Sequence, residues 1–163
     1  MPDTPVSGDD VDALKLLQAQ HEDVKTMFER YDSLVEDEAP ADERQQLAKN
    51  ICAALTIHAQ IEEEVFYPAA REALDEEDLL DEALVEHDSA KRLIAEIEAM
   101  KADDPMFDAK VKVLGEYIDH HVQEEEHEMF PKARKSEMDL QALGEQMKQR
   151  TMALVEEMGI VPA

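Results

Sequence analysis

Apolar residues recur through most of the chain at alternating steps of three and four, which is the period of an amphipathic α-helix. Five stretches show this pattern, separated by short acidic or proline-containing linkers. We expect the first helix to open at Asp9 or Asp10, the second to follow residues 38–40 and loosen near Pro68, the third to span about residues 77–101, the fourth to run from Asp104-Pro105 to Pro131, and the last to span about residues 138–158.

Short linkers between four long helices favour antiparallel neighbours, so the predicted fold is all-α, an up-down-up-down antiparallel four-helix bundle with an additional C-terminal helix. The 163 residues, 44% of them apolar, suffice for one compact domain with its own core. Only 4 residues are glycine, which also suits helices. We expect a flexible tail at residues 1–8, the bundle at residues 9–134, and a C-terminal helix at residues 135–163 that packs on the bundle or at a subunit contact.

Histidine and glutamate interrupt the apolar stripes of the four bundle helices at similar depth. A glutamate follows the histidine by four positions in the second and fourth helices, so each pair lies on one helix face, about 6 Å apart along the axis. These inward residues are the candidate metal ligands: His21, His58, Glu62, His87, His121 and Glu125.

The candidate ligands belong to a repeat. The segment 58–68 resembles 121–131, and the segment 20–25 resembles 86–91. The repeat implies an approximate two-fold axis along the bundle, with two histidines from each half at one metal ion and the two glutamates bridging both ions. Without metal, so many buried ionisable groups would be costly to desolvate. The sequence therefore predicts a two-metal site.

We expect other polar residues near these motifs to have other roles. His120 and His127 lie off the stripe, so we expect them at the surface. Tyr117, one turn before His121, is a candidate hydrogen-bond donor to the ligands. Whether Glu63 or Glu126 also coordinates a metal stays open at this stage.

The net charge and the cysteine content limit the kinds of partner and metal site that we expect. The net charge of -25 disfavours nucleic acid and anionic membranes, which bind clustered lysine and arginine. No apolar run approaches the roughly 20 residues that span a bilayer, and no signal pattern opens the chain, so we expect a cytoplasmic protein. The lone Cys52 excludes an intramolecular disulfide and a cysteine-based zinc site. Nitrogen and oxygen ligands of this kind suit iron or manganese.

The order of these motifs over about residues 10–134 resembles the hemerythrin-like, or HHE cation-binding, domain, a four-helix bundle with a non-haem di-iron centre. The most specific matching parts are the two His-x3-Glu-Glu segments and the pair Glu86-His87. The resemblance implies two iron ions with an oxo or hydroxo bridge, manganese being second. It assigns His21, His58, His87 and His121 as terminal ligands, and Glu62 and Glu125 as bridging carboxylates.

The oxygen-carrying hemerythrins use a fifth histidine where this chain has Lys91, and an aspartate bridge where it has Glu125. The missing ligand leaves one open position on each ion, which suits redox chemistry on a small molecule. We expect a protein that binds or reduces O2, hydrogen peroxide or nitric oxide, as a sensor, a scavenger or an enzyme with peroxidase-like, catalase-like or oxidase activity.

Two alternatives stay open. Ferritin-like iron handling needs two inward Glu-x-x-His pairs, and the sequence offers one, Glu124 with His127. A metal-free interaction bundle would use the last helix to dimerise but leaves the inward histidines unexplained. The chain is expected to be a monomer or a homodimer.

Overall fold

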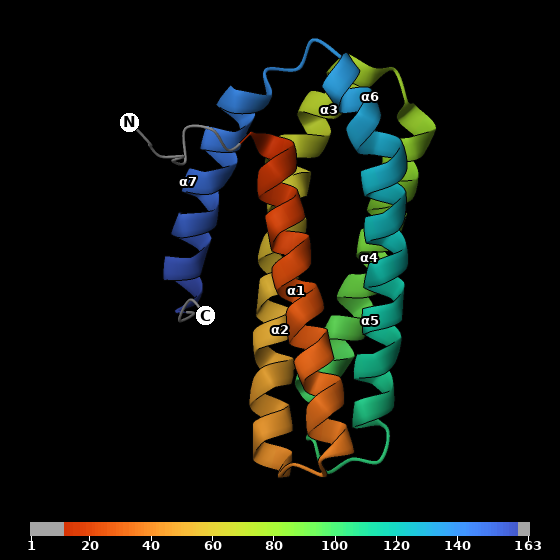
Figure 1. The fold of residues 1–163 in the computed structure, drawn as a ribbon, viewed down its shortest axis with the longest axis vertical. Coiled ribbons are helices and arrows are strands. Elements are labelled where there is room, and N and C mark those ends of the chain that lie inside the picture. Colours follow the sequence, from red (N-terminus) through yellow and green to blue (C-terminus); the bar gives the residue numbers. More distant parts are fainter. Residues whose placement is uncertain (1–11, 160–163) are drawn as a thin grey trace.

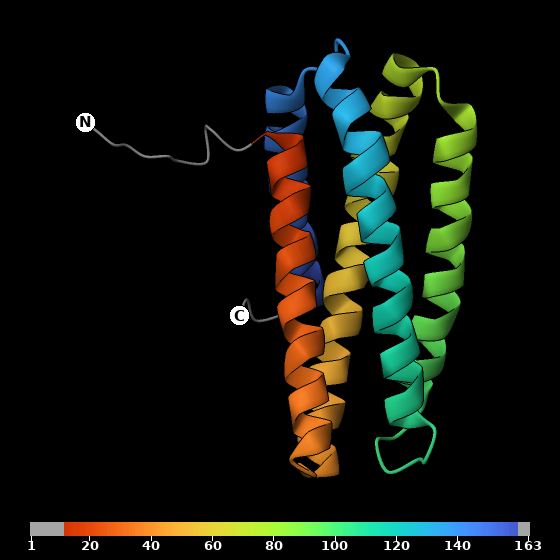
Figure 2. The same ribbon diagram turned by 45° about the vertical axis from the view of Figure 1, so that its right-hand side comes forward.

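The computed structural model describes residues 12–159 and contains a bundle of four long helices in which neighbours along the chain run antiparallel (Figures 1 and 2). The four are α1 (Ala13–Glu36), α2 (Ala41–Ile61), α4 (Glu77–Ala99) and α5 (Phe107–Glu124). No β-strand occurs within residues 12–159. The all-α bundle predicted from the hydrophobic pattern is confirmed.

Two of the long helices continue through a wider, π-helical turn into a short helix. After α2 come η2 (Glu62–Phe66) and α3 (Tyr67–Leu74), and after α5 come η3 (Glu125–Met129) and α6 (Phe130–Lys135). The second residue of each short helix is a proline, Pro68 or Pro131. Proline lacks a backbone N–H and clashes with the carbonyl four residues earlier, and a widened turn accommodates both effects. The change expected near Pro68 thus begins six residues earlier, at Glu62.

The first helix begins at Ala13, and the side chain of Asp12 caps it by accepting a hydrogen bond of 2.9 Å from the Lys15 backbone N–H. Asp9, Asp10 and the tail expected at residues 1–8 lie outside the described residues. The last helix, α7 (Leu140–Met158), packs along α1 and α2 beside the bundle (Figure 1). Its Met147 and Leu154 are buried in that contact.

Buried apolar side chains form two clusters along the bundle. The upper cluster lies toward α3, α6 and α7 and includes Leu14, Ile61, Phe66 and Phe130. The lower cluster lies toward the opposite end and includes Val24, Ile51, Ile94 and Leu114. The polar residues that interrupt the stripes fall between these clusters. Among the described helices, none combines the length and apolar character needed to cross a membrane.

Candidate metal centre

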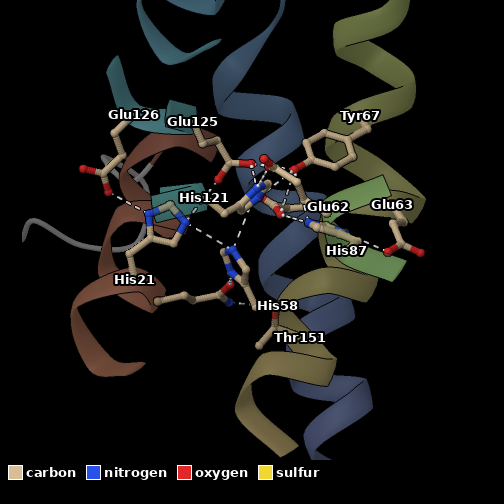
Figure 3. Close-up of polar contacts among 12 residues, drawn as sticks. His21, His58, Glu62, Glu63, Tyr67, His87, His121, Glu125, Glu126 and Thr151 are labelled. Atoms are coloured by element: carbon tan, nitrogen blue, oxygen red, sulfur yellow. Dashed lines mark hydrogen bonds and ion pairs between the residues drawn. The ribbon is translucent and has the colours of Figure 1, made fainter. Parts of the chain in front are cut away.

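One layer of buried polar side chains crosses the bundle between the two apolar clusters. It contains all six candidate ligands, each from an inward position of its helix (Figure 3). Their residue exposures are at most 9%, and Glu62 is fully buried. The structure therefore brings together all six candidate metal ligands: His21, His58, Glu62, His87, His121 and Glu125.

The first ligand group joins His21 and His58 to one oxygen of each glutamate. The two Nε2 atoms lie 3.2 Å apart. Glu125 Oε1 lies 3.2 Å from His21 Nε2, and Glu62 Oε2 lies 3.5 Å from His58 Nε2. Metal–ligand bonds of about 2.0–2.2 Å at near-right angles place neighbouring ligand atoms about 3 Å apart, so this group can surround one ion.

The second ligand group uses the other oxygen of each glutamate. Glu62 Oε1 lies 3.0 Å from His87 Nε2, and Glu125 Oε2 lies 3.6 Å from His121 Nε2. Each carboxylate therefore has one oxygen toward the histidines of the first half and one toward those of the second half. This is the arrangement required of two carboxylates that bridge a pair of ions.

The outer ring nitrogens of the histidines are also held by side chains. His21 Nδ1 lies 2.6 Å from Glu126 Oε2, and His87 Nδ1 lies 2.7 Å from Glu63 Oε2. Glu63 and Glu126, whose coordination the sequence left open, thus contact the histidine nitrogens that face away from the ligand groups. In this position they fix the orientation of each ring and leave Nε2 free for a metal.

The histidines of α2 and α5 have different outer partners. His121 Nδ1 bonds to the Glu86 carboxylate, whereas His58 Nδ1 lies 2.6 Å from the amide oxygen of Gln20. The amide nitrogen of Gln20 in turn donates a hydrogen bond of 3.4 Å to the hydroxyl of Thr151 on α7. The last helix is therefore connected to the site through Gln20.

Electrostatics within the layer favour imidazolium–carboxylate pairs when no metal is bound. Burial disfavours a charged His21, but the hydrogen bond to Glu125 and the nearby carboxylates outweigh burial and raise the pKa of His21 to about 9. The same balance raises the pKa of His121 to about 10. Burial disfavours ionised Glu62 as well, yet the charge and hydrogen bond of His58 hold its pKa well below the usual range. A divalent ion would displace these protons.

Sequence reasoning missed Tyr67, whose hydroxyl reaches the centre of the layer (Figure 3). It donates a hydrogen bond of 2.6 Å to Glu125 Oε2 and lies 3.1 Å from Glu62 Oε1. It also lies 3.3 Å from His87 Nε2. Tyr67 is five residues after Glu62, a spacing that an ordinary helix does not place on one face. The π-helical turn does, because the Tyr67 N–H bonds to the Glu62 carbonyl.

The remaining candidates lie away from the layer. Tyr117, the expected hydrogen-bond donor, is half-buried and packs against the lower cluster. The His120 side chain is 66% exposed and lies 3.3 Å from Glu124. His127 is exposed, so the Glu-x-x-His pair of a ferritin-like site does not face the interior.

Two buried oxygens show whether the site fits a metal. Among residues 12–159, Glu62 Oε2 and Glu125 Oε1 are the buried side-chain oxygens that lack a hydrogen-bond partner. Leaving a buried carboxylate oxygen unsatisfied is costly. Both oxygens belong to the first ligand group, where a metal ion would satisfy them. The residues present therefore fit a bound metal.

A buried layer of imidazoles and carboxylates within a helical bundle is typical of a cation-binding helical protein. Comparison by sequence agrees, since the profile of the hemerythrin HHE cation-binding domain matches residues 12–133. The chain belongs to this family.

Two similar proteins provide further context. A crystal structure of a hemerythrin HHE cation-binding domain-containing protein from Mycobacterium kansasii superposes with a TM-score of 0.75, at 24% sequence identity, covering 90% of this chain and 89% of that one. At this identity the likeness concerns the fold alone. A protein named DNA nickase from Nostoc sp. strain PCC 7120 is 38% identical over 80 residues, which cover 49% of this chain and 22% of that protein.

Proposed function

We propose that the chain is a non-haem di-iron protein that binds or reduces a small oxidant, namely O2, hydrogen peroxide or nitric oxide. One observation carries the proposal. In both Glu62 and Glu125, one carboxylate oxygen faces the histidines of the first half and the other oxygen faces the histidines of the second half. His21 and His58 would hold one ion, and His87 and His121 the other. Bound iron would supply electron exchange and a binding position for the oxidant.

The surrounding residues support a reaction in which protons are transferred to oxygen atoms of the oxidant. The Tyr67 hydroxyl lies within hydrogen-bond distance of both bridging carboxylates, so it can deliver a proton beside the oxidant. Reduction of hydrogen peroxide to water takes up two protons with two electrons from a reductant, and its disproportionation to water and O2 moves protons between oxygens without net uptake, so a proton donor beside the oxidant assists both reactions. Tyr67 thus favours a scavenger or a peroxide-decomposing enzyme over a carrier.

The same features bear on the alternatives. A metal-free interaction bundle would leave two buried glutamate oxygens without a hydrogen bond, and only the nearby His21 and His58, at 3.2 and 3.5 Å, would offset the cost of burying them. Ferritin-like iron handling finds no support in the exposed His127. The DNA nickase name describes a protein of which the match covers 22%, and the net charge of -25 supports no nucleic-acid partner for this chain. A cytoplasmic location and a monomeric or homodimeric state belong to the same proposal.

The test is elemental analysis of protein expressed with iron, together with visible spectra recorded before and after reduction and after mixing with O2, hydrogen peroxide or nitric oxide. We expect about two irons per chain, with a spectrum that changes on reaction with at least one oxidant. A folded protein that takes up no iron would overturn the proposal. The reactions with the three oxidants, compared in rate and turnover, separate a sensor from an enzyme.

A further inference from the structure

A cavity of about 450 Å³ lies inside the bundle next to the polar layer. Side chains of α1, α2, α4 and α5 line it, and four of them are the histidines of the two ligand groups. Its other walls include apolar side chains of the lower cluster: Val24, Leu55, Ala90, Ile94, Val111 and Ile118. A molecule in the cavity would therefore meet the metal ligands at one end and an apolar wall elsewhere.

Small residues make room for this cavity. Ala90 follows His87 by three positions, where the first half has the larger Val24 three positions after His21. Gly115 lies opposite Phe28, and a Cβ at Gly115 would come within 3.0 Å of the Phe28 ring. A side chain at this position would force the Phe28 ring to move away from the α5 backbone by a few tenths of an ångström.

The exposed residues of the lining show where the cavity opens. They lie mainly on α1 and α5, so the entrance runs between these two helices. Six carboxylates and three lysines line the cavity and its entrance: Glu22, Glu29, Asp32, Glu116, Asp119 and Glu126, with Lys25, Lys91 and Lys112. The excess of negative charge, on a chain of net charge -25, repels anions and leaves neutral molecules unhindered.

The volume exceeds what a small oxidant needs. A water molecule requires about 10–15 Å³ of volume measured in this way, and O2 or hydrogen peroxide is of comparable size. Pockets of roughly 300–1,000 Å³ are those that hold organic ligands, mostly through apolar walls with a few polar groups. The 450 Å³ cavity, with polar groups at one end, falls in this class.

We infer that this cavity binds a neutral, largely apolar organic molecule with a single polar end, such as a medium-chain alcohol or hydroperoxide, oriented with that end toward the histidines. The apolar part would lie against the lower cluster, and the polar end would lie beside the Nε2 atoms of the ligand groups. Binding is a property of the cavity itself. Its use to bring an organic peroxide to the metal rests on the proposed function.

The experiment is isothermal titration of the iron-loaded full chain with 1-butanol, 1-hexanol, 1-octanol and the octanoate anion. If the chain of the alcohol enters the apolar cavity, Kd should fall about fourfold for each added CH2. Octanoate should bind at least about tenfold more weakly than 1-octanol, because the entrance is acidic. Equal Kd values for butanol and octanol, or no binding of any alcohol, would overturn the inference.

Matched variants locate the binding. Ala90→Leu and Ala59→Leu each fill part of the cavity and should weaken octanol binding by at least about tenfold, whereas Ala95→Leu on the exposed face of α4 should not. Thermal melting and iron content of each variant identify any that fails to fold, and the two cavity variants come from different helices. Loss of binding in Ala95→Leu to the same extent would place the alcohol outside the cavity and contradict the inference.

The titration is repeated on metal-free protein, which distinguishes the two proposals. Octanol binding by a protein that takes up no iron would overturn the di-iron function and support the cavity site. Iron uptake and oxidant reactivity without octanol binding would overturn the cavity site alone.

Discussion

His21 and His58 in the first half of the bundle correspond to His87 and His121 in the second half, yet their surroundings differ. Both second-half histidines have carboxylates on their outer nitrogens, whereas His58 has the amide of Gln20. A carboxylate partner makes a histidine a stronger metal ligand than an amide does. The repeat therefore keeps the candidate ligands but makes the two ligand groups chemically unequal.

Aromatic residues also make the surroundings of the two ligand groups different. Tyr67 packs beside His87, with ring centroids 5.3 Å apart, and brings a hydroxyl to that end of the site. The corresponding residue of the other half is Phe130, which stacks on His21 at 6.1 Å and has no hydroxyl. We infer that the position of His87 and His121 holds its ion more tightly and receives protons, while the position of His21 and His58 is the weaker one.

The largest expected effect comes from removing a bridge, which both positions share. Glu62→Ala should lower iron affinity more than about 100-fold, because both ligand groups lose an oxygen. Losing a residue that only hydrogen-bonds to a metal ligand typically lowers metal affinity by about 10–100-fold. Chelator competition followed by elemental analysis measures the effect. The control is Glu64→Ala, in the same π-helical turn but exposed and paired with Arg150. Full iron content in Glu62→Ala would refute a shared bridge.

Tyr67→Phe tests the proton donor and makes the two halves alike at this position. We expect the reaction with hydrogen peroxide to slow about 100-fold, the lower range for loss of a general acid, with iron content unchanged. Stopped-flow absorbance measures the rate. Phe130→Tyr is the matched control, since it adds a hydroxyl at the other end without removing the first. An unchanged rate in Tyr67→Phe would remove the tyrosine from the chemistry.

Exchanging the residues that hydrogen-bond to the outer nitrogens of His121 and His58 should reverse which of the two ions is bound more tightly. Glu86→Gln should weaken metal binding by about 10–100-fold at the position of His121, whereas Gln20→Glu should strengthen it at the position of His58. Stepwise titration with iron or manganese separates the two affinities. If both substitutions weaken binding, the partners act through packing rather than through charge.

The halves should also differ in pH dependence when metal is absent. The folded pKa values of His21 and His121 are about 9 and about 10, above the ordinary value of 6.5, because the buried carboxylates favour the charged rings. Their protonation thus stabilises the metal-free fold fully below pH 6.5, and this stability is lost as pH rises through 9 and then 10. We expect Tm of the metal-free protein to fall across that range. A Tm independent of pH there would show that these imidazoles are neutral in the folded state.

The smallest expected effect is on the reactivity of the Cys52 thiol. Cys52 corresponds to Gly115 in the other half of the repeat. Burial, with the nearby charge of Glu98, raises the pKa of the Cys52 thiol to about 12. Thiol reagents at pH 8 should therefore leave the native protein unlabelled and react only after denaturation, as mass spectrometry can show. Rapid labelling of native protein would mean that the lower cluster opens readily.

Much of the site could be predicted because its signals are local. The spacing of His58 and Glu62, repeated at His121 and Glu125, sets two side chains on one face of any helix. Their place within an apolar stripe indicates burial before any helix is packed. The class of fold follows from the same periodicity, and both predictions agree with the structure.

Residues whose role depends on a departure from the regular helix could not be found in this way. A period of 3.6 residues favours Phe66 for the inner face and gives no reason to place Tyr67 beside Glu62. The widened turn that does so follows from proline and from packing at the top of the bundle. Tyr117, which regular spacing favoured, packs below the site instead.

By itself, the sequence determined the helices, their buried faces and the set of candidate ligands, since these depend on positions within single helices. Only the tertiary structure decided which glutamate oxygen faces which histidine and which outer partner each histidine has. It also decided that α7 contacts Gln20 through Thr151. These are contacts between helices, and their geometry depends on how each helix is rotated and shifted against its neighbours, which no local period specifies.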